Sequence, residues 1–342
     1  MNILITGSSG FAAEHLIPSL KTLGHYIIGC DRLEKPSADV DEYVQFDLLN
    51  IEDFSVTERN IDCVIHLAAA RADWGVTDEE YFRDNFEATQ KLLDFCIVKK
   101  INKFLFVSTI AVYPQENSTP LDEQAPEAPF NAYGKSKLEA ENLLIGYLRR
   151  NPNFCLNIVR PSVLYGPSNP ANTGLYRAID NNVFRLIDGI NKRRFLFIGD
   201  ETTPKSTAYI KNFVGALNFL LPSMPGYGVY IYCDEPHMTT GRLVRFIRQQ
   251  LGRKNLGPSL KFYYAVKIAK VSDWIAKLTG INFPVTSARI QTFNRPTAFK
   301  RTALNKLSFK QAYSSEEALV ETITWYKGLE KDLGWKSIIF RK

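Results

Sequence analysis

Short apolar runs alternate with helical patterns along the first half of the chain. The runs contain almost no charged residues, which is typical of strands buried on both faces of a parallel sheet. The predicted strands are 2–6, 26–30, 62–67, 104–107 and 154–159, and the predicted helices are 11–23, 78–99 and 135–148. This alternation predicts an α/β fold of the Rossmann type, a doubly wound parallel sheet with helices on both faces.

The pattern loosens in the second half of the chain. Proline and glycine residues between 161 and 174 predict loops. The elements expected beyond them are a strand at 229–233, a helix at 240–251 and a last helix through Tyr326, which opens with the capping-box spacing of Ser314 and Glu317. We therefore expect two parts: a sheet domain of residues 1–165 and about 206–255, and a smaller C-terminal lobe of about 166–205 and 256–342.

A glycine-containing loop joins the first predicted strand to the first predicted helix. The backbone amides at a helix N-terminus favour a phosphate group. Gly7 permits the tight turn, Gly10 permits close approach of a ligand, and the small Ala13 permits close packing of helix on strand. The loop therefore predicts a dinucleotide-binding site, with Gly7, Ser9, Gly10, Phe11 and Ala13 as its contact residues.

Further residues of this predicted site follow the next strands. Asp31 lies 21 residues beyond Gly10, where an acid accepts hydrogen bonds from the adenosine ribose and repels a 2′-phosphate. Asp31 favours NAD over NADP, whereas the neighbouring Arg32 is able to pair with that phosphate. The remaining expected cofactor contacts are Asp47 and Leu48 at the adenine, and Leu67, Ala68 and Ala69 where the dinucleotide passes over the sheet edge. We interpret His66, which precedes them, as a core histidine.

A tyrosine and a lysine stand four residues apart at the start of the helix predicted at 135–148. At this spacing Tyr133 and Lys137 project from one helix face. An ammonium beside a phenol lowers the phenol pKa from about 10, which makes Tyr133 a candidate acid and base. Lys137 is also placed to hold the nicotinamide ribose. Ser108 and Thr109 end the preceding strand and offer hydroxyls to a substrate oxygen.

The motifs as a set resemble the extended short-chain dehydrogenase/reductase family, in its branch of NAD-dependent nucleotide-sugar epimerases, dehydratases and 4-ketoreductases. They are T-G-x-x-G-F at 6–11, the His66–Ala70 run, Ser108-Thr109 with Val112-Tyr113, Tyr133-x-x-x-Lys137 and R-P-S-V-L-Y-G-P at 160–167. The resemblance implies a triad of Thr109, Tyr133 and Lys137 with Ser108 adjacent. It also implies that Pro161 and Ser162 lie by the nicotinamide amide.

The resemblance also bears on the substrate. Ile110 and Ala111 stand where 4,6-dehydratase relatives have an Asp-Glu pair, which argues against elimination of water. Lys205 occupies the place of an arginine that holds the diphosphate of the sugar nucleotide, and Arg295 resembles the second cation. Asn172 is expected to touch the nucleotide. The implied substrate is therefore a nucleotide-sugar.

Four functions remain open at this point. The leading hypothesis is a nucleotide-sugar 4-epimerase that uses bound NAD for transient oxidation at C4. A 4-ketoreductase would use the same triad once. The C-terminal third resembles 3β-hydroxysteroid and dihydroflavonol dehydrogenases, which act on apolar alcohols. A dinucleotide-sensing regulator would keep the fold without turnover, and the intact triad counts against it.

Composition and charge narrow the partners. The 342 residues carry 42 Lys and Arg against 36 Asp and Glu, a net charge of +6 that suits a small anionic ligand and is too scattered for nucleic acid. The five cysteines form no C-x-x-C pair, which predicts reduced thiols and no metal site. The start of the chain has no signal-peptide pattern, so we expect a cytoplasmic protein.

Two surfaces are expected to make contacts. The helical patterns at 78–99 and 135–148 resemble the pair that forms a four-helix homodimer interface in the family, with Phe86, Leu93, Leu144 and Ile145 as candidate apolar positions. The pattern at 260–278 predicts a helix with a one-sided apolar stripe, and its charged residues exclude a membrane span. We expect this stripe either to pack in the core or to lie on a membrane surface with its lysines toward the headgroups.

Overall fold

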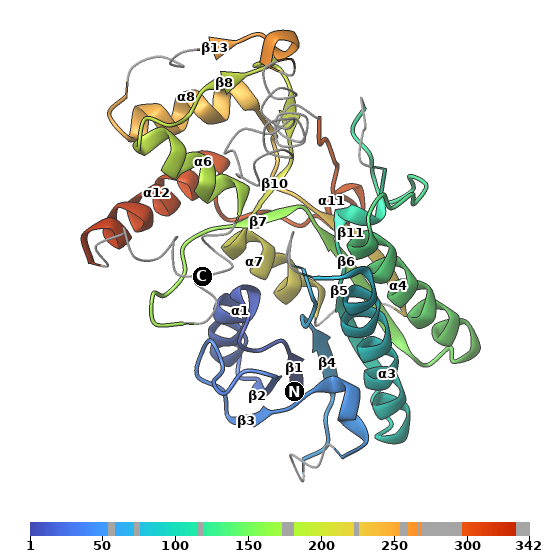
Figure 1. The fold of residues 1–342 in the computed structure, drawn as a ribbon. Coiled ribbons are helices and arrows are strands. Elements are labelled where there is room, and N and C mark those ends of the chain that lie inside the picture. The colour runs from blue at the N-terminus through green and yellow to red at the C-terminus, as the bar shows by residue number, and fades with distance from the viewer. Residues whose placement is uncertain are drawn as a thin grey trace.

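The computed structural model of the chain describes residues 1–53, 59–71, 76–114, 119–172, 181–221, 226–253, 259–265, 267 and 296–332. Its centre is a parallel sheet of seven strands in the order β11-β6-β5-β4-β1-β2-β3 (Figure 1). The strands are β1 (Asn2–Thr6), β2 (Tyr26–Asp31), β3 (Glu42–Gln45), β4 (Cys63–His66), β5 (Lys103–Val107), β6 (Cys155–Pro161) and β11 (Tyr227–Tyr232). The predicted Rossmann-type fold is confirmed.

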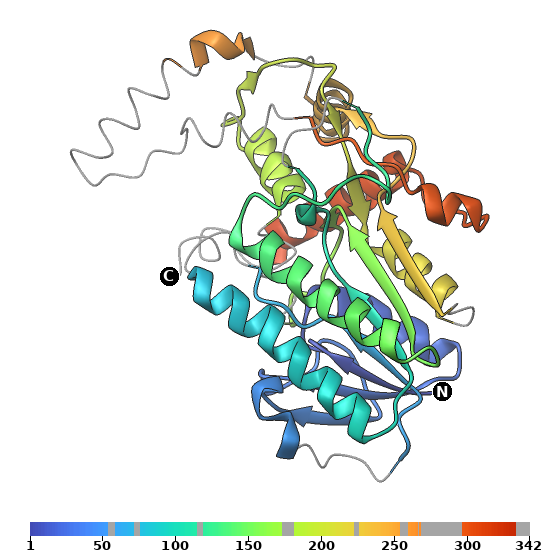
Figure 2. The same ribbon diagram turned by 90° about the vertical axis from the view of Figure 1, so that its right-hand side faces the viewer.

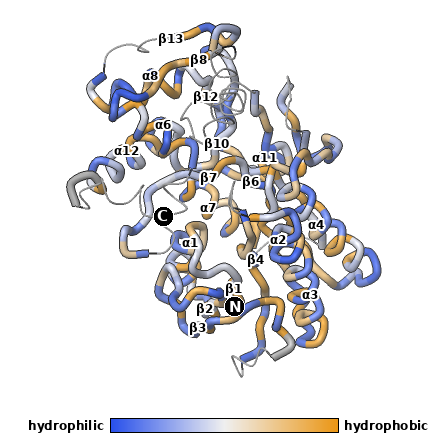
Figure 3. The backbone as a smooth tube through the Cα atoms, in the orientation of Figure 1, coloured by the Kyte–Doolittle hydropathy of each residue, from blue (hydrophilic) through white to orange (hydrophobic). Residues whose placement is uncertain are grey.

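Helices cover both faces of this sheet, as the uninterrupted apolar strands require. The helices α1 (Phe11–Thr22) and α7 (Ile210–Leu220) pack on one face, and α3 (Ala88–Val98) and α4 (Ala132–Arg150) run side by side on the other (Figure 2). Successive residues of β1 point to opposite faces of the sheet. Ile3 and Ile5 pack in the core that contains α1 and α7, and Leu4 packs in the core that contains α3 and α4. The orange colour of β4 in Figure 3 shows how apolar this layer is.

The helix predicted at 78–99 is built from three pieces. A helical turn, α2 (Asp78–Tyr81), leads into a π-helical turn, η2 (Phe82–Glu87), and then into α3. Thr77 and Glu80 close a capping box at its start. A π-helical turn widens the helix by one residue and is common at functional sites. Here it carries the buried Asn85, which is considered with the site below.

The upper part of Figure 1 is a second layer of helices and short strand pairs. Its helices α6 (Asn182–Asn191), α8 (Thr240–Gln250) and α12 (Ser315–Asp332) pack together. The strand pairs are β7 (Val163–Tyr165) with β10 (Thr207–Tyr209), β9 (Pro204–Lys205) with β12 (Met238–Thr239), and β8 (Phe197–Ile198) with β13 (Ser259–Leu260). The predicted capping box of α12 is present, because Ser314 Oγ accepts the Glu317 amide and the Glu317 carboxylate accepts the Ser314 amide.

The boundary between the two parts stays a prediction. The sequence places 206–255 in the sheet domain, and α7 indeed packs there, whereas α8 packs against α6 and α12. Short helical pieces complete the description: η1 (Leu48–Asp53), η3 (Ile110–Val112) and α11 (Thr302–Lys306). Among the described residues no helix is both long and apolar enough to cross a membrane.

The structure corrects part of the expected dimer surface. Leu93 and Leu144 lie in the core between α3, α4 and the sheet, with exposed fractions of 3% and 0%. They are therefore unavailable to a partner, because each helix turns its most apolar stripe toward its own sheet. Phe86 and Ile145 are partly exposed and remain candidates.

Candidate active site

The predicted phosphate loop lies where the strand order reverses, between β1 and β4. Gly7 has a φ of +72°, and a Cβ there would stand 2.6 Å from the backbone nitrogen of Ala68. The amide of Gly7 donates to Cys30 O at 2.9 Å, so the loop is fastened to the end of β2 as well. Only glycine fits this conformation and this gap. In open α/β sheets such a switch point is where ligands bind.

Asp31 and Arg32 stand beside this loop at the end of β2. The Asp31 carboxylate accepts the Ser9 amide at 3.0 Å, which places the acid at the mouth of the loop. The Arg32 guanidinium donates to both carboxylate oxygens of Asp84 at 2.9 Å, and its Nε lies 3.1 Å from Asp47. Burial raises the pKa of Asp84, but the guanidinium groups of Arg32 and Arg83 outweigh it and hold that pKa at about 2. Because Arg32 is engaged by two carboxylates, the structure favours a ribose with a free 2′-hydroxyl, as in NAD.

Three buried serine hydroxyls line the same edge of the sheet. Ser8, Ser108 and Ser162 follow β1, β5 and β6, and within the described part of the chain their Oγ atoms have no hydrogen-bond partner. A buried hydroxyl without a partner costs free energy. A polar ligand that lies along this edge would supply the missing partners. The residues present therefore fit a bound dinucleotide.

The first turn of α4 is pressed against the end of β5. A Cβ on Gly134 would stand 2.2 Å from Ala111 O, so glycine is required between Tyr133 and the η3 turn. Asn131 caps the helix, since its Oδ1 accepts the Gly134 amide at 2.8 Å. Thr109 Oγ1 accepts the Ala111 amide at 3.1 Å and keeps its proton to donate. This packing brings the backbones that carry Tyr133 and Thr109 together.

Lys137 lies one helical turn beyond Tyr133 and is almost wholly buried. Its Nζ stands 3.9 Å from the centre of the Phe106 ring. Burial lowers the pKa of Lys137 to about 7, and Glu141 one turn further along α4 acts in the opposite direction. A group with a pKa near neutrality exchanges protons readily under physiological conditions. Lys137 thus lies against β5, one helical turn from Tyr133, with a pKa that suits proton exchange.

Asn85 is a site residue that the sequence interpretation did not include. Its side chain joins three elements: Oδ1 accepts the Ala70 amide at 2.8 Å, and Nδ2 donates to Ala70 O and to Ser136 Oγ. Ser136 Oγ in turn donates to Tyr133 O. The π-helical turn places Asn85 here, and no pattern of apolar positions signals such a turn. Asn85 thus links Ala70, in the loop after β4, to the start of α4.

A second network beneath the site was also missed. The buried Arg160 donates from Nε to both Glu141 oxygens at 3.1 and 3.2 Å, and from Nη1 to Tyr113 Oη at 2.6 Å. It therefore ties β6 to α4 and to the chain after β5. The sequence contained a sign of this ion pair. Glu141 lies four residues beyond Lys137, on the same helix face, and Arg160 opens the R-P motif.

His66 is a core residue, as expected. Its Nδ1 lies 2.6 Å from Thr6 Oγ1 and its Nε2 lies 3.0 Å from Thr89 Oγ1, so both ring nitrogens have partners. Its ring stacks on Phe106. Burial holds the His66 pKa well below its ordinary value. A neutral histidine with both nitrogens engaged is positioned to support β4, whose end leads into Leu67 and Ala68.

Lys205, one of the residues expected to hold the substrate, lies in the second layer. Lys205 ends β9, and its neighbour Ser206 donates its amide to Thr297 O at 2.7 Å. Burial lowers the pKa of Lys205 to about 8. Arg295 lies outside the described residues, two positions before Thr297. Asn172 donates to Ser37 O at 2.5 Å, which places it on the dinucleotide-loop side.

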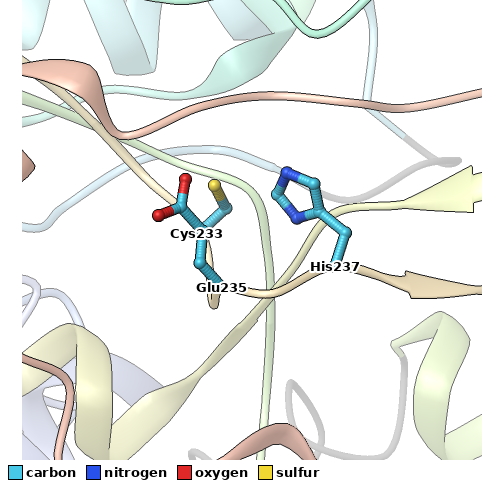
Figure 4. Close-up of side chains that lie close together, drawn as sticks. All are labelled: Cys233, Glu235 and His237. Carbon is cyan, nitrogen blue, oxygen red and sulfur yellow. The ribbon is translucent and has the colours of Figure 1, made fainter.

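The loop after β11 brings Cys233, Glu235 and His237 together (Figure 4). Their donor atoms lie within 4.8 Å of one another. The Cys233 thiol donates to a backbone carbonyl, and the Glu235 carboxylate binds Asn305 Nδ2 at 3.0 Å and Arg301 Nε at 3.3 Å. The Arg301 guanidinium thus pairs with the carboxylate that a cation would need as a ligand. We interpret the group as a structural contact between this loop and α11.

The chain is similar in sequence to known 4-epimerases along most of its length. Among curated proteins, the chain is 28% identical to the N-acetyl-alpha-D-glucosaminyl-diphospho-ditrans,octacis-undecaprenol 4-epimerase of Escherichia coli O157:H7, over 95% of both chains. It is 29% identical to a UDP-glucose 4-epimerase of Vibrio cholerae, over 82% of this chain and 85% of that one.

Solved structures share the fold. A UDP-glucuronic acid 4-epimerase from Bacillus cereus in complex with NAD superposes with a TM-score of 0.72 at 22% identity, over 96% of this chain and 99% of that one. MoeE5 in complex with UDP-glucose and NAD gives 0.71 at 25% identity, with coverage of 96% and 99%. The model of the NAD dependent epimerase/dehydratase family matches residues 3–230, two thirds of the chain. With these motifs at one sheet edge, the chain belongs to the NAD dependent epimerase/dehydratase family.

Proposed function

We propose that the protein is a 4-epimerase of a hexose linked through a diphosphate to a nucleoside. The observation that carries this proposal is the placement of Thr109, Tyr133 and Lys137 around one strand end, beside a loop that fits NAD. The chain has Ile110 and Ala111 directly after Thr109. Neither side chain exchanges protons, so water elimination has no acid or base at these positions.

The residues divide the chemistry between them. Tyr133 removes the proton of the C4 hydroxyl, and Thr109 donates a hydrogen bond to the same oxygen. Lys137 lowers the cost of the phenolate form of Tyr133 while its ammonium is protonated. NAD, when bound, supplies a hydride acceptor for C4 and returns the hydride. If the keto sugar rotates in the pocket, C4 receives the hydride on its opposite face. Tyr133 then returns the proton to the C4 oxygen.

Lys205 and Arg295 are proposed to hold the substrate diphosphate. The backbone pairing of 204–206 with Thr297 supports this role, because it brings the segment that follows Arg295 alongside Lys205. Asn172 donates a hydrogen bond to Ser37 O in this structure. A contact between Asn172 and the substrate nucleotide stays a prediction. A diphosphate carries the negative charge that two such cations match.

A second candidate substrate undergoes the same reaction but has its sugar diphosphate linked to a lipid in place of a nucleoside. The relative from Escherichia coli O157:H7, which aligns over 95% of both chains, is a 4-epimerase of a sugar diphosphate carried by undecaprenol. The diphosphate contacts would be the same for a polyprenol and for a nucleoside. We therefore propose the lipid-linked sugar as the alternative substrate.

The proposed reaction is tested by incubating the NAD-loaded protein with UDP-glucose and UDP-N-acetylglucosamine and following the sugars by NMR. We expect the 4-epimer to accumulate to equilibrium with no net change in NADH absorbance. Steady NADH consumption with a 4-keto sugar would identify a reductase instead. Failure to bind UDP, together with turnover of a steroid alcohol, would favour the apolar-alcohol dehydrogenase.

We further propose a cytoplasmic homodimer. Cys30, Cys63, Cys96 and Cys233 are free and buried in the described structure, as expected of a reducing compartment. The exposed side of the α3–α4 pair is the proposed dimer face.

A further inference from the structure

Three consecutive aromatic side chains face solvent at the outer end of the upper layer. Phe262, Tyr263 and Tyr264 are 41, 62 and 56% exposed, and they lie in a helical turn directly after β13. The next residue, Ala265, is buried against the β8–β13 pair. The turn is thus anchored by its small residue and leaves its large apolar residues outside. A contiguous cluster of exposed rings marks a contact site.

Cations accompany these rings. Lys267 Nζ lies 4.3 Å from the centre of the Tyr263 ring, and Lys261 is exposed beside Phe262. The loop before β8, the partner strand of β13, adds the exposed Arg193 and Arg194. The segments 192–199 and 259–267 together contain five Lys and Arg residues and no Asp or Glu. Aromatic rings beside lysines suit the boundary between lipid tails and anionic headgroups.

We propose that this aromatic–basic patch, made of Arg193, Arg194, Lys261–Tyr264 and Lys267, docks the protein on an anionic lipid surface. The turn that carries the aromatic residues of the patch is the orange one at the top of Figures 1 and 2, at the outer end of the molecule. A projecting turn can enter a headgroup layer, whereas a second copy of the chain would bring like charges together. Anionic phosphates match all of its cations.

The docked orientation bears on the substrate. β8 leads within seven residues to Lys205, the proposed diphosphate ligand. Arg193 and Arg194 of the patch therefore lie in the same continuous segment as Lys205, and the pairing of β8 with β13 joins the aromatic turn to it. This consequence rests on the proposed function: docking would present the site to a sugar diphosphate carried by a membrane lipid, the second candidate above. Lipid binding itself does not depend on which sugar is used.

Flotation with vesicles tests the proposal. The unmodified protein is expected to float with phosphatidylglycerol-containing vesicles at low salt, weakly with phosphatidylcholine alone, and less as salt screens the charges. Replacing Lys261 and Lys267 by Gln should weaken partitioning about 25-fold, about fivefold for each charge. Replacing Phe262, Tyr263 and Tyr264 together by Ser should abolish it. The matched controls, Tyr227→Ser and the pair Lys306→Gln and Lys310→Gln, alter exposed residues elsewhere and should bind as the unmodified protein does.

Three results would overturn the proposal: no flotation of the unmodified protein, equal flotation of the patch variants, or equal losses in the control variants. A change in oligomeric mass caused by the patch substitutions would identify a copy interface and would also overturn it. Epimerisation of a water-soluble UDP-sugar without vesicles should be unchanged in every patch variant. Absence of that reaction in the unmodified protein would refute the nucleotide-linked substrate, and the flotation result would still stand or fall by itself.

Discussion

Three neighbouring residues fix the position of Tyr133. Asn131 starts its helix, Gly134 sets its distance from Ala111, and Ser136 holds its carbonyl. Each neighbour controls where the phenol lies without touching the reacting atoms. Productive geometry of this kind accounts for a large part of the rate that an acid–base residue supplies.

Replacing Tyr133 by Phe therefore has a defined expectation. The ring still packs near Tyr81, whose ring centre is 5.9 Å away, but the proton is lost. Turnover should fall by about 10²–10⁴-fold. The dissociation constant of NAD, measured by calorimetry, should change little. Turnover equal to that of the unmodified protein would remove Tyr133 from the mechanism.

Lys205 predicts a pH dependence of substrate binding. Burial lowers the Lys205 pKa to about 8 in the free protein, and a bound diphosphate stabilises its protonated form. Affinity is thus greatest below pH 8 and should fall by up to about tenfold per unit as the pH rises above that value.

Calorimetric titration with UDP on either side of this pKa measures the effect. The variant Lys205→Arg is the matched control, since a guanidinium keeps its proton throughout this range. It should show a shallower fall in affinity than the unmodified protein. The same slope in both proteins would mean that Lys205 does not hold the diphosphate.

At the scale of elements, the position of α4 against η3 decides whether the triad assembles. The contact is backbone against backbone, because the Cβ position of Gly134 is occupied by Ala111 O at 2.2 Å. The Arg160–Glu141 pair holds the same helix to β6. α4 is therefore held at two points. A substitution that pushes the helix away from η3 is opposed by the Arg160–Glu141 pair.

Gly134→Ala should consequently move α4 by about an ångström and lower stability by about 1–3 kcal/mol. A displacement of this size costs about 10²-fold in turnover. The control is Gly146→Ala in the same helix, where nothing lies within 4 Å of the new Cβ. That change should stabilise the protein by about 0.5–1 kcal/mol and leave turnover unchanged. Thermal unfolding and initial rates check both, and equal behaviour of the two variants would contradict the packing argument.

At the scale of the whole molecule, the dimer face remains to be tested. The two helices lie side by side on one side of the sheet (Figure 2), and Val98 near the end of α3 is 77% exposed. A two-fold interface would bury such residues against their own copies.

Light scattering should therefore give about twice 38.9 kDa. Val98→Glu should shift the mass toward the monomer, because it places two like charges at the interface. Leu307→Glu, an exposed leucine elsewhere, should not. A monomeric unmodified protein at micromolar concentration would rule out this assembly.

Much of this molecule follows from local patterns along the chain. Uninterrupted apolar runs specify buried parallel strands, since both faces of each strand must meet helices. The glycine loop, Asp31 and the Tyr133–Lys137 spacing are likewise readable, because each depends on residues that are close in sequence. The capping box at Ser314 is a local signal of the same kind.

Tertiary structure decided what depends on residues far apart in the sequence. The sequence leaves open whether Arg32 binds a phosphate, and its pairing with Asp84, 52 positions away, answers this. Asn85 acquires its role through a π-helical turn and through its hydrogen bonds to Ala70, 15 residues earlier in the loop after β4. Leu93 and Leu144 look alike as core or interface residues until the helices are placed on the sheet. Apolar periodicity identifies the buried face of an element, whereas only the packed fold identifies what buries it.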